Sequence, residues 1–357
     1  MNSLFAPHTL GSLTLGNRIV MAPMTRSRRP DHIPDADTAD YYRQRAGAGL
    51  IITEGVFVSP EAQGYSHVPG LWTDEQAAGW AGVTEAVHGA GGRVFAQLWH
   101  VGRVSHSSLQ PGGAAPVGPS ALRAQAQVWI GDAGFADADT PRPLRTDEIP
   151  RLIADFADAA ARAARSGFDG VELHGAHGFL FEQFLNAHVN DRTDRYGGSV
   201  ENRARFLLET LDALADRIGS HRVGVRLSPF TLANDLPVDD STEDLYAYLA
   251  QQLTGRALAY VHLSDLHLSG GSDISEDFLK TFRHNYDGTV LLAGGLDRAR
   301  AEYLLNAGLV DFAVFGRPFI ANPDLVERLR DDLPLATPDP ATFYGGGTEG
   351  YTDYPRR

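Results

Sequence analysis

The feature that most constrains the fold of this chain is an alternation of short apolar runs with longer segments of helical period. Eight runs rich in Val, Ile, Leu and Phe follow one another, separated by segments rich in Ala, Leu and Arg. This alternation is typical of strand–helix units around a parallel sheet. The strands are expected at residues 18–21, 50–53, 94–98, 170–173, 223–227, 260–263, 289–293 and 312–315. Eight units predict an α/β fold of the (β/α)8 TIM-barrel type, with an open doubly wound sheet as the competing arrangement.

No low-complexity linker divides the 357 residues, so a single domain over residues 1–357 is expected. Two segments lie outside the repeat. The N-terminal stretch HTLGSLTLGN indicates a β-hairpin that could close the bottom of the barrel, and residues 101–145 form a Gly-, Pro- and Ser-rich excursion after the third strand. A loop of that length is usually functional or disordered, and we expect it to form a lid over the top face. Residues 332–357 are expected to form a C-terminal tail.

The composition excludes several classes of function. Asp and Glu outnumber Lys and Arg by 45 to 31, and the net charge of -14 opposes binding to nucleic acid or anionic lipid. The chain has no cysteine, which removes disulfides, thiolate zinc sites, Cys nucleophiles and cysteine-ligated iron–sulfur clusters together. No window approaches the ~18 apolar residues of a membrane span, and the start lacks the order of a secretory signal. A cytoplasmic location is expected, with no membrane or nucleic-acid partner.

In a barrel of this type the chemistry lies at the carboxyl ends of the strands. Glu54 and Asp265 are the only carboxylates found there, without a sign that they face each other, so glycoside hydrolysis by two carboxylates is not indicated. His174 and His177 follow the fourth strand within HGAH, but no third metal ligand is evident beside them. The sequence therefore predicts no metal site.

The last two strands are followed by the pattern of a phosphate site. LLAGGLD and VFGRPF place Gly294, Gly295, Gly316 and Arg317 after strands seven and eight, where backbone N–H groups and a guanidinium can hold a phosphate. Either motif alone could be a strand end or a solvated charge, but the pair favours phosphate binding. GGGTEG near the C-terminus has the spelling of a dinucleotide fingerprint, yet it follows no strand and opens no helix. A phosphate-bearing cofactor is therefore expected on the barrel itself.

Motifs along nearly the whole chain resemble those of the Old Yellow Enzyme group of flavin-dependent ene-reductases. They are LFAPHTLGSLTLGNRIVMAPMTRSR, FAQLWHVGRVSHSSLQPGG, VELHGAHGF, NDRTDRYGGSVENRARF, GVRLSPF, AGGLD, FGRPFIANPDL and FYGGGTEGYTDYP. Each motif alone is weak, but the set is highly specific. The resemblance implies a barrel that holds FMN non-covalently and uses NADH or NADPH as hydride donor, as a monomer or a homodimer.

The resemblance also implies contacts to the flavin. Thr25 would hydrogen-bond the flavin carbonyl near N5, and Arg226 would stand near N1, where negative charge collects in the reduced ring. Gln97 would bond the pyrimidine edge. The other ring and phosphate contacts that it implies are Pro23, Met24, Gly55, Gly294, Gly295, Gly316 and Arg317. A buried ion pair for Arg226 and a satisfied core amide for Gln97 are the alternative interpretations.

The two histidines would act on the substrate. His174 and His177 would each donate an N–H to one oxygen of the acceptor and draw electron density toward it, so that the β-carbon accepts hydride more readily. A helix-start cap and half of a metal site are other interpretations. In most of the family a tyrosine two residues beyond the second histidine protonates the α-carbon, but here the residue is Phe179, which has no proton to give. Solvent, Tyr65 or Tyr344 would then supply the proton.

The predicted function is that of an FMN-dependent NAD(P)H oxidoreductase that reduces the activated C=C bonds of enones, enals and nitroalkenes by hydride transfer from reduced flavin N5. Reduction of quinones or nitro compounds and a hydride-returning isomerisation are alternatives, because the missing hydroxyl matters less for them. A barrel that binds flavin or a phosphorylated ligand without turnover is a further alternative. We expect the substrate pocket to be shaped by Tyr65, Trp72, Trp99, Tyr344 and the 101–145 excursion.

Overall fold

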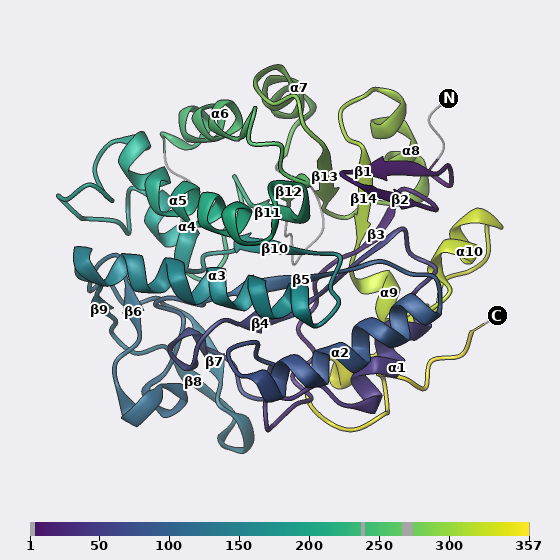
Figure 1. Ribbon diagram of the computed structural model, residues 1–357, viewed down its shortest axis with the longest axis horizontal. Helices are drawn as coiled ribbons and strands as arrows, with labels where there is room; N and C mark the ends of the chain where they lie inside the picture. The colour runs from purple at the N-terminus through teal and green to yellow at the C-terminus, as the bar shows by residue number, and fades with distance from the viewer. Residues whose placement is uncertain (1–3, 237–239, 266–273, 357) are drawn as a thin grey trace.

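Eight parallel strands form the centre of the molecule in the computed structural model, which describes residues 4–236, 240–265 and 274–356 (Figure 1). They close into a barrel in the order β3, β4, β5, β10, β11, β12, β13, β14. Their bounds are Ile19–Met21, Leu50–Phe57, Val94–Trp99, Gly170–Gly175, Val223–Leu227, Tyr260–Ser264, Val290–Ala293 and Phe312–Phe315. The last strand pairs with the first, Val314 opposite Val20. The predicted TIM barrel is therefore confirmed, and the open sheet is wrong.

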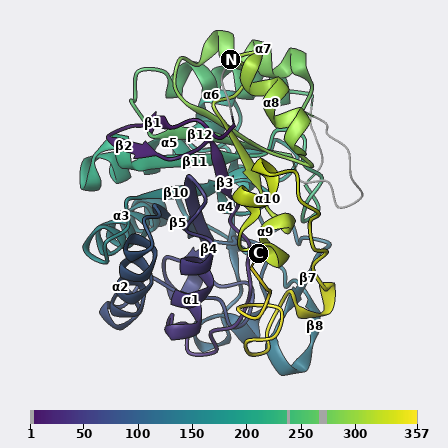
Figure 2. The same cartoon turned by 90° about the vertical axis from the view of Figure 1, so that its right-hand side faces the viewer.

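Helices cover the outside of the barrel, as Figures 1 and 2 show. Their bounds are α1 Ala36–Gln44, α2 Asp74–Gly89, α3 Ile149–Arg165, α4 Leu180–Leu185, α5 Val200–Ile218, α6 Thr242–Leu253, α7 Glu276–Asn285, α8 Arg298–Asn306, α9 Arg317–Ala321 and α10 Leu325–Arg330. Helix α2 begins with a capping box, in which the Thr73 side chain accepts from the Gln76 N–H and the Gln76 side chain accepts from the Thr73 N–H. In the described parts of the chain, no helix is both long enough and apolar enough to cross a membrane.

The predicted N-terminal hairpin is present and lies at the amino-terminal end of the barrel. Strands β1 (His8–Leu10) and β2 (Leu13–Leu15) pair antiparallel. Leu10 and Leu15 pack in one apolar cluster with barrel residues. The ring of His8 lies 5.2 Å from that of Phe312, the first residue of β14. With this end covered, the carboxyl ends of the strands are left as the place for a ligand.

The 101–145 excursion after β5 contains two small sheets. Strand β6 (Val117–Gly118) pairs with β9 (Arg142–Pro143), and β7 (Gln127–Trp129) pairs with β8 (Phe135–Asp137). The second pair carries Trp129 and Phe135, and both of these side chains line the cavity described below. The excursion therefore reaches the carboxyl end of the barrel, and its action as a lid stays a prediction.

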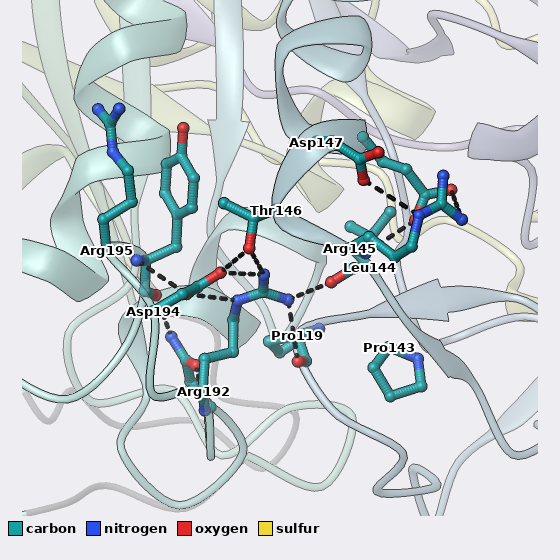
Figure 3. A network of polar contacts seen from close by, with 12 residues as sticks. Pro119, Pro143, Leu144, Arg145, Thr146, Asp147, Arg192, Asp194 and Arg195 are labelled. Atoms are coloured by element: carbon teal, nitrogen blue, oxygen red, sulfur yellow. Dashed lines mark hydrogen bonds and ion pairs between the residues drawn. The ribbon is translucent and has the colours of Figure 1, made fainter.

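A cluster of charged contacts holds the excursion at two points, Pro119 and Leu144 (Figure 3). Arg192, in the loop between α4 and α5, donates to the carbonyl groups of Pro119 and Leu144 and to the carboxylate of Asp194, with 3.0 Å between Arg192 Nε and Asp194 Oδ1. Partial burial opposes the ionisation of Asp194, but the hydrogen bonds from Arg192 and Thr146 outweigh it and lower the pKa of Asp194 to about 2. Charge-assisted bonds of this kind are stronger than neutral ones, so they fix the excursion to the barrel's own loop.

The C-terminal segment lies near the β7–β8 hairpin (Figure 2). Arg26 donates to the carbonyl groups of Thr342, Phe343 and Gly350, and so ties this segment to the loop after β3. A Cβ on Gly345 would lie 3.7 Å from the ring of Trp129. The tail and the excursion therefore meet beside the mouth of the barrel.

Candidate active site

A cavity of about 960 Å³ opens at the carboxyl ends of the barrel strands. Small-molecule sites usually measure ~300–1,000 Å³, so this one has room for a cofactor and a substrate together. Most of the predicted site residues line it. They are Pro23, Met24, Thr25, Tyr65, Gln97, Trp99, His174, His177, Phe179, Arg226, Gly294, Gly295, Gly316, Arg317 and Tyr344.

Gly55 and Trp72 are not among the lining residues. A Cβ on Gly55 would lie 2.5 Å from Trp99 Cε3, so the glycine makes room for the indole of Trp99, which itself lines the cavity. Its contact with a cofactor stays a prediction. Trp72 packs instead against His32, with 5.5 Å between the ring centroids, and the expectation that it shapes the pocket is wrong.

One end of the cavity has the character of an anion cradle. Gly294 and Gly295 have φ angles of 150° and 56°, which L-residues with a side chain rarely adopt. A Cβ on Gly294 would also lie 2.7 Å from Cβ of Asp265, so this position needs glycine. Gly316 precedes α9, and the exposed Arg317 forms no ion pair with any residue that the structure describes. Flexible backbone N–H groups beside a free guanidinium fit a phosphate.

A buried carboxylate holds two side chains beneath the cavity by hydrogen bonds. Its role is not predicted by the sequence. Glu172 lies in the middle of β10, fully buried, where it accepts from Gln97 Nε2 at 2.7 Å and from His262 Nδ1 at 2.8 Å. Burial alone would raise the pKa of Glu172, but the contacts with His262 and Arg226 outweigh it and lower the pKa. Because the side-chain NH2 group of Gln97 donates to Glu172, the amide oxygen of Gln97 is left as the acceptor for a ligand.

Arg226 remains a cation beside this carboxylate. Burial lowers its pKa to about 10, and Glu172 opposes that shift. One guanidinium nitrogen donates to Ser264 Oγ at 2.9 Å, while the buried Nε has no partner among the described residues. A cation balanced by a carboxylate and still carrying a free N–H suits a ring on which negative charge develops.

The two histidines lie together in the cavity wall. His174 is on β10, in register with Arg226, and His177 is in the turn that follows. Their ring centroids are 5.5 Å apart. Burial, followed by the charge of Arg226, lowers the pKa of both imidazoles well below the usual value, so both are neutral at pH 7. The buried Nδ1 of His174 has no partner in the described chain, which leaves it open to a ligand.

Ser264 is the hydrogen-bond partner of the His177 ring. Its Oγ accepts from Arg226 and lies 2.9 Å from His177 Nε2. When the Ser264 hydroxyl donates to Nε2, the ring hydrogen of His177 is on Nδ1, where it can serve as a donor. Nothing in the sequence assigns this role to Ser264, because a serine at a strand end has no pattern of its own.

Aromatic rings form the wall next to the histidines. Phe179 contacts Trp99 and His174 edge-on, with centroids 4.8 and 5.2 Å away. Tyr65 stacks on Trp99 and lies 6.5 Å from Phe179. Tyr344 lines the cavity from the tail and is 61% exposed. Of the two tyrosines considered as proton donors, Tyr65 is therefore the one whose ring contacts Phe179.

Several lining residues were not predicted. Asn234, Trp129, Phe135 and Phe343 come from loops, the excursion and the tail. Single aromatic or amide residues in loops carry no signal of periodicity or spacing. Among the described residues, no three His, Asp or Glu side chains gather as they would around a metal ion.

The fold and the site together define a class: a TIM barrel whose mouth combines a glycine-rich end beside an exposed arginine, a buried cation and two neutral imidazoles, as suits an anionic cofactor. Comparisons with known proteins give the family. The model of the NADH:flavin oxidoreductase / NADH oxidase family matches residues 3–336. The chain is 44% identical over 358 residues to 12-oxophytodienoate reductase 1 of Oryza sativa subsp. japonica, covering 99% of this chain and 92% of that protein.

Two solved structures are similar over nearly the whole chain. Morphinone reductase is 50% identical with a TM-score of 0.97, covering 100% of this chain and 97% of that one. The Old Yellow Enzyme homologue from Zymomonas mobilis is 40% identical with a TM-score of 0.95, covering 99% of both chains. The chain therefore belongs to the Old Yellow Enzyme family, as its motifs predict, and is an NAD(P)H-dependent flavin oxidoreductase with FMN as cofactor.

Proposed function

We propose that this protein reduces activated C=C bonds of enones, enals and nitroalkenes, and that His174 and His177 hold the acceptor oxygen. The observation that carries the proposal is the pair of neutral, buried imidazoles in one cavity wall, with an unpartnered Nδ1 on His174. The similar proteins support the reaction class, because they are named as reductases of 12-oxophytodienoate and of morphinone. Another structure of morphinone reductase is described as a complex with tetrahydroNAD, which supports a nicotinamide donor here.

The cavity residues fit FMN at both ends. The N–H groups of Gly294, Gly295 and Gly316 and the guanidinium of Arg317 would hold the phosphate. At the ring end, the amide oxygen of Gln97 would accept from the ring N–H, and Arg226 would face the pyrimidine. Thr25, Pro23 and Met24 would line the ring, with the Thr25 hydroxyl as a donor. When bound, FMN supplies the hydride that it has received from NAD(P)H.

The imidazoles of His174 and His177 would act on the acceptor oxygen. As the β-carbon accepts hydride, negative charge develops on this oxygen, and two fixed N–H donors stabilise that charge more than they stabilise the ground state. Ser264 keeps the donor hydrogen of His177 on Nδ1. Both rings are neutral, so they hold the oxygen without giving up a proton.

The proton for the α-carbon would come from Tyr65 in this protein. Phe179 occupies the place of the usual tyrosine and has no hydroxyl. The Tyr65 ring lies next to that of Phe179 and lines the same cavity. Burial raises the pKa of Tyr65, so the phenol keeps its proton at neutral pH.

A second function, the reduction of quinones or nitro compounds, is favoured by Phe179. These acceptors place the added hydrogen on oxygen or nitrogen, which exchange protons with water directly. We expect them to be reduced faster than simple enones. The hydride-returning isomerisation lacks an observation in its favour.

Alanine variants of the histidines test the proposal. Removing one preorganised donor typically costs ~10²–10³-fold in rate, so His174→Ala and His177→Ala should each lower kcat/KM for cyclohexenone to that extent. The flavin spectrum serves as the control for FMN content, and gas chromatography of cyclohexanone measures the product. Unchanged kcat/KM in both FMN-loaded variants would contradict the roles of the two histidines.

A further inference from the structure

The turn that carries His177 has an unusual backbone. His177 and the following Gly178 both lie in the left-handed region, with φ angles of 58° and 76°. Glycine adopts this conformation readily, but a residue with a side chain does so only when its surroundings enforce it. Gly178 packs closely against residues 233–234, because a Cβ at that position would lie 2.5 Å from the carbonyl oxygen of Ala233. The left-handed conformation of His177 therefore depends on the contacts of its own backbone groups.

The N–H groups of His177 and Gly178 are both linked by hydrogen bonds to one carboxylate, that of Glu182. The N–H of Gly178 donates to Glu182 Oε2 at 2.5 Å. The N–H of His177 donates to Ser228 Oγ at 2.8 Å, and the Ser228 hydroxyl donates to Glu182 Oε1 at 2.7 Å. Glu182 is on α4, one turn of helix beyond the histidine, and Ser228 follows β11. The two residues form a clamp on the amide side of the turn.

The carbonyl groups of the same turn are also held by side chains. Asn234 Nδ2 donates to the carbonyl oxygen of His177 at 2.8 Å, and Gln183 Nε2 donates to that of Gly178 at 2.8 Å. Buried backbone groups outside regular structure need such partners. The backbone of His177 and Gly178 is thus fixed on both sides, and the amide side depends on Glu182 and Ser228 alone.

Glu182 is a buried carboxyl group without a cation partner among the described residues. Only 7% of the residue is exposed, and no cation pairs with it in the described chain. Burial raises its pKa to about 7. Neither Glu182 nor Ser228 lines the large cavity; both line a separate small pocket beside α4 and α6. An unpaired buried carboxyl group is unfavourable unless hydrogen bonds offset its desolvation, and here the donors are the Gly178 N–H, Ser228 and, at 3.5 Å, Tyr246.

We propose that Glu182 and Ser228 are positioning residues, which hold His177 in the left-handed turn that aims its imidazole at the acceptor oxygen. This inference rests on the proposed function, because it takes His177 as a donor to that oxygen. Glu182 acts through its hydrogen bonds to Gly178 and Ser228 and not through its charge. A glutamine can still bond both partners: its oxygen accepts from the Gly178 N–H, and its amide donates to the Ser228 oxygen, so that the bond with Ser228 runs in the opposite direction.

The test compares substitutions that remove or keep these hydrogen bonds in the FMN-loaded protein. Glu182→Leu removes the bonds to Gly178 and Ser228, Glu182→Gln keeps one bond to each, and Ser228→Ala removes both the acceptor of the His177 N–H and the donor to Glu182 Oε1. Tyr246→Phe is the matched control, because it removes a hydroxyl that donates to Glu182 Oε1 at 3.5 Å and leaves the bonds of Glu182 to Gly178 and Ser228 in place. The probe is p-chlorophenol, whose oxygen would occupy the place of the acceptor oxygen, and its dissociation constant is measured from the absorbance of the bound flavin.

We expect Glu182→Leu to raise both the dissociation constant for p-chlorophenol and the Michaelis constant for cyclohexenone, by about tenfold each. Ser228→Ala should raise both by about fivefold, since the His177 N–H loses its acceptor. Glu182→Gln should recover values within about twofold of the wild type, as should Tyr246→Phe. Ser228→Ala decides the matter if Glu182→Leu does not yield folded holoprotein.

His177→Ala separates failure of this inference from failure of the proposed function. If His177→Ala binds p-chlorophenol weakly while Ser228→Ala and Glu182→Leu bind it as the wild type does, the clamp is not needed and the inference is overturned. A lower melting temperature with unchanged phenol affinity leads to the same conclusion, because it shows a purely structural role. If His177→Ala itself binds as tightly as the wild type, the proposed role of the histidine fails first.

Discussion

Replacing Phe179 with Tyr should restore a proton donor to the wall of the cavity. The ring is held by Trp99 at 4.8 Å and by His174 at 5.2 Å, so the added hydroxyl enters a defined position at the cavity face. The substitution keeps the shape of the ring, and we expect a stability change below ~1 kcal/mol. A positioned general acid contributes ~10²–10⁴-fold. Because the proposed function assigns part of this to Tyr65, we expect the variant to gain about tenfold to a hundredfold.

The assay is anaerobic stopped flow with the two half-reactions measured separately. Enzyme reduced with one equivalent of NADPH is mixed with cyclohexenone, and reoxidation is followed through the flavin absorbance. A tenfold gain corresponds to about 1.4 kcal/mol of transition-state stabilisation. Reduction of the flavin by NADPH needs no proton on carbon, so its rate should stay within about twofold and serves as the internal control. A menadione rate that also stays constant would confirm that the gain concerns protonation of carbon.

An unchanged enone rate in Phe179→Tyr would refute this reasoning. It would mean either that hydride transfer alone limits the reaction or that another group already protonates the α-carbon without loss. The Tyr65→Phe variant distinguishes these two explanations, because only the second predicts that the enone rate falls when Tyr65 loses its hydroxyl.

Three further predictions concern the contacts of the site. Gly294→Ala should raise the FMN dissociation constant at least about tenfold, because the new Cβ would meet Asp265 at 2.7 Å; fluorescence titration with FMN measures it, and an unchanged constant contradicts the close approach. Ser264→Ala should lower kcat/KM for cyclohexenone about tenfold in steady-state assays, because His177 loses the partner that fixes its tautomer; equal values would contradict that role. Glu182→Gln should gain stability over the wild type as the pH rises from 5 to 8. The folded state binds a proton at Glu182 up to about pH 7 and the unfolded chain only to about pH 4.5, so wild-type stability falls across this range by about 3 kcal/mol. A melting-temperature difference that does not change with pH would contradict this assignment.

The barrel can be predicted from the sequence because its strands are buried on both faces and appear as short, continuous apolar runs. β11 and β14 have the bounds that their runs predict. The strand expected at residues 50–53 continues to Phe57, since β4 passes through Glu54 and Gly55 with a shift of register between Ile52 and Gly55. A polar residue inside a strand breaks the apolar pattern, although the backbone pairing continues around it.

The site is only partly predictable for a related reason. The rule that chemistry lies at strand ends finds His174 and Arg226, because chain position alone brings them to one edge. It misses Glu172, which acts from the middle of β10, and Glu182, which acts from a helix. Their roles depend on hydrogen bonds to residues 46 to 90 positions away in the chain. Such pairings are set by the closed barrel and leave no local pattern.

The most direct test of the central claim is one anaerobic absorption experiment on the purified holoprotein. The account predicts a flavin spectrum that NADPH bleaches and that cyclohexenone restores, with one equivalent of FMN released on denaturation. A protein that is bleached by NADPH but is restored by neither cyclohexenone nor a nitroalkene would contradict the proposed reaction. A protein without releasable FMN would contradict the site itself.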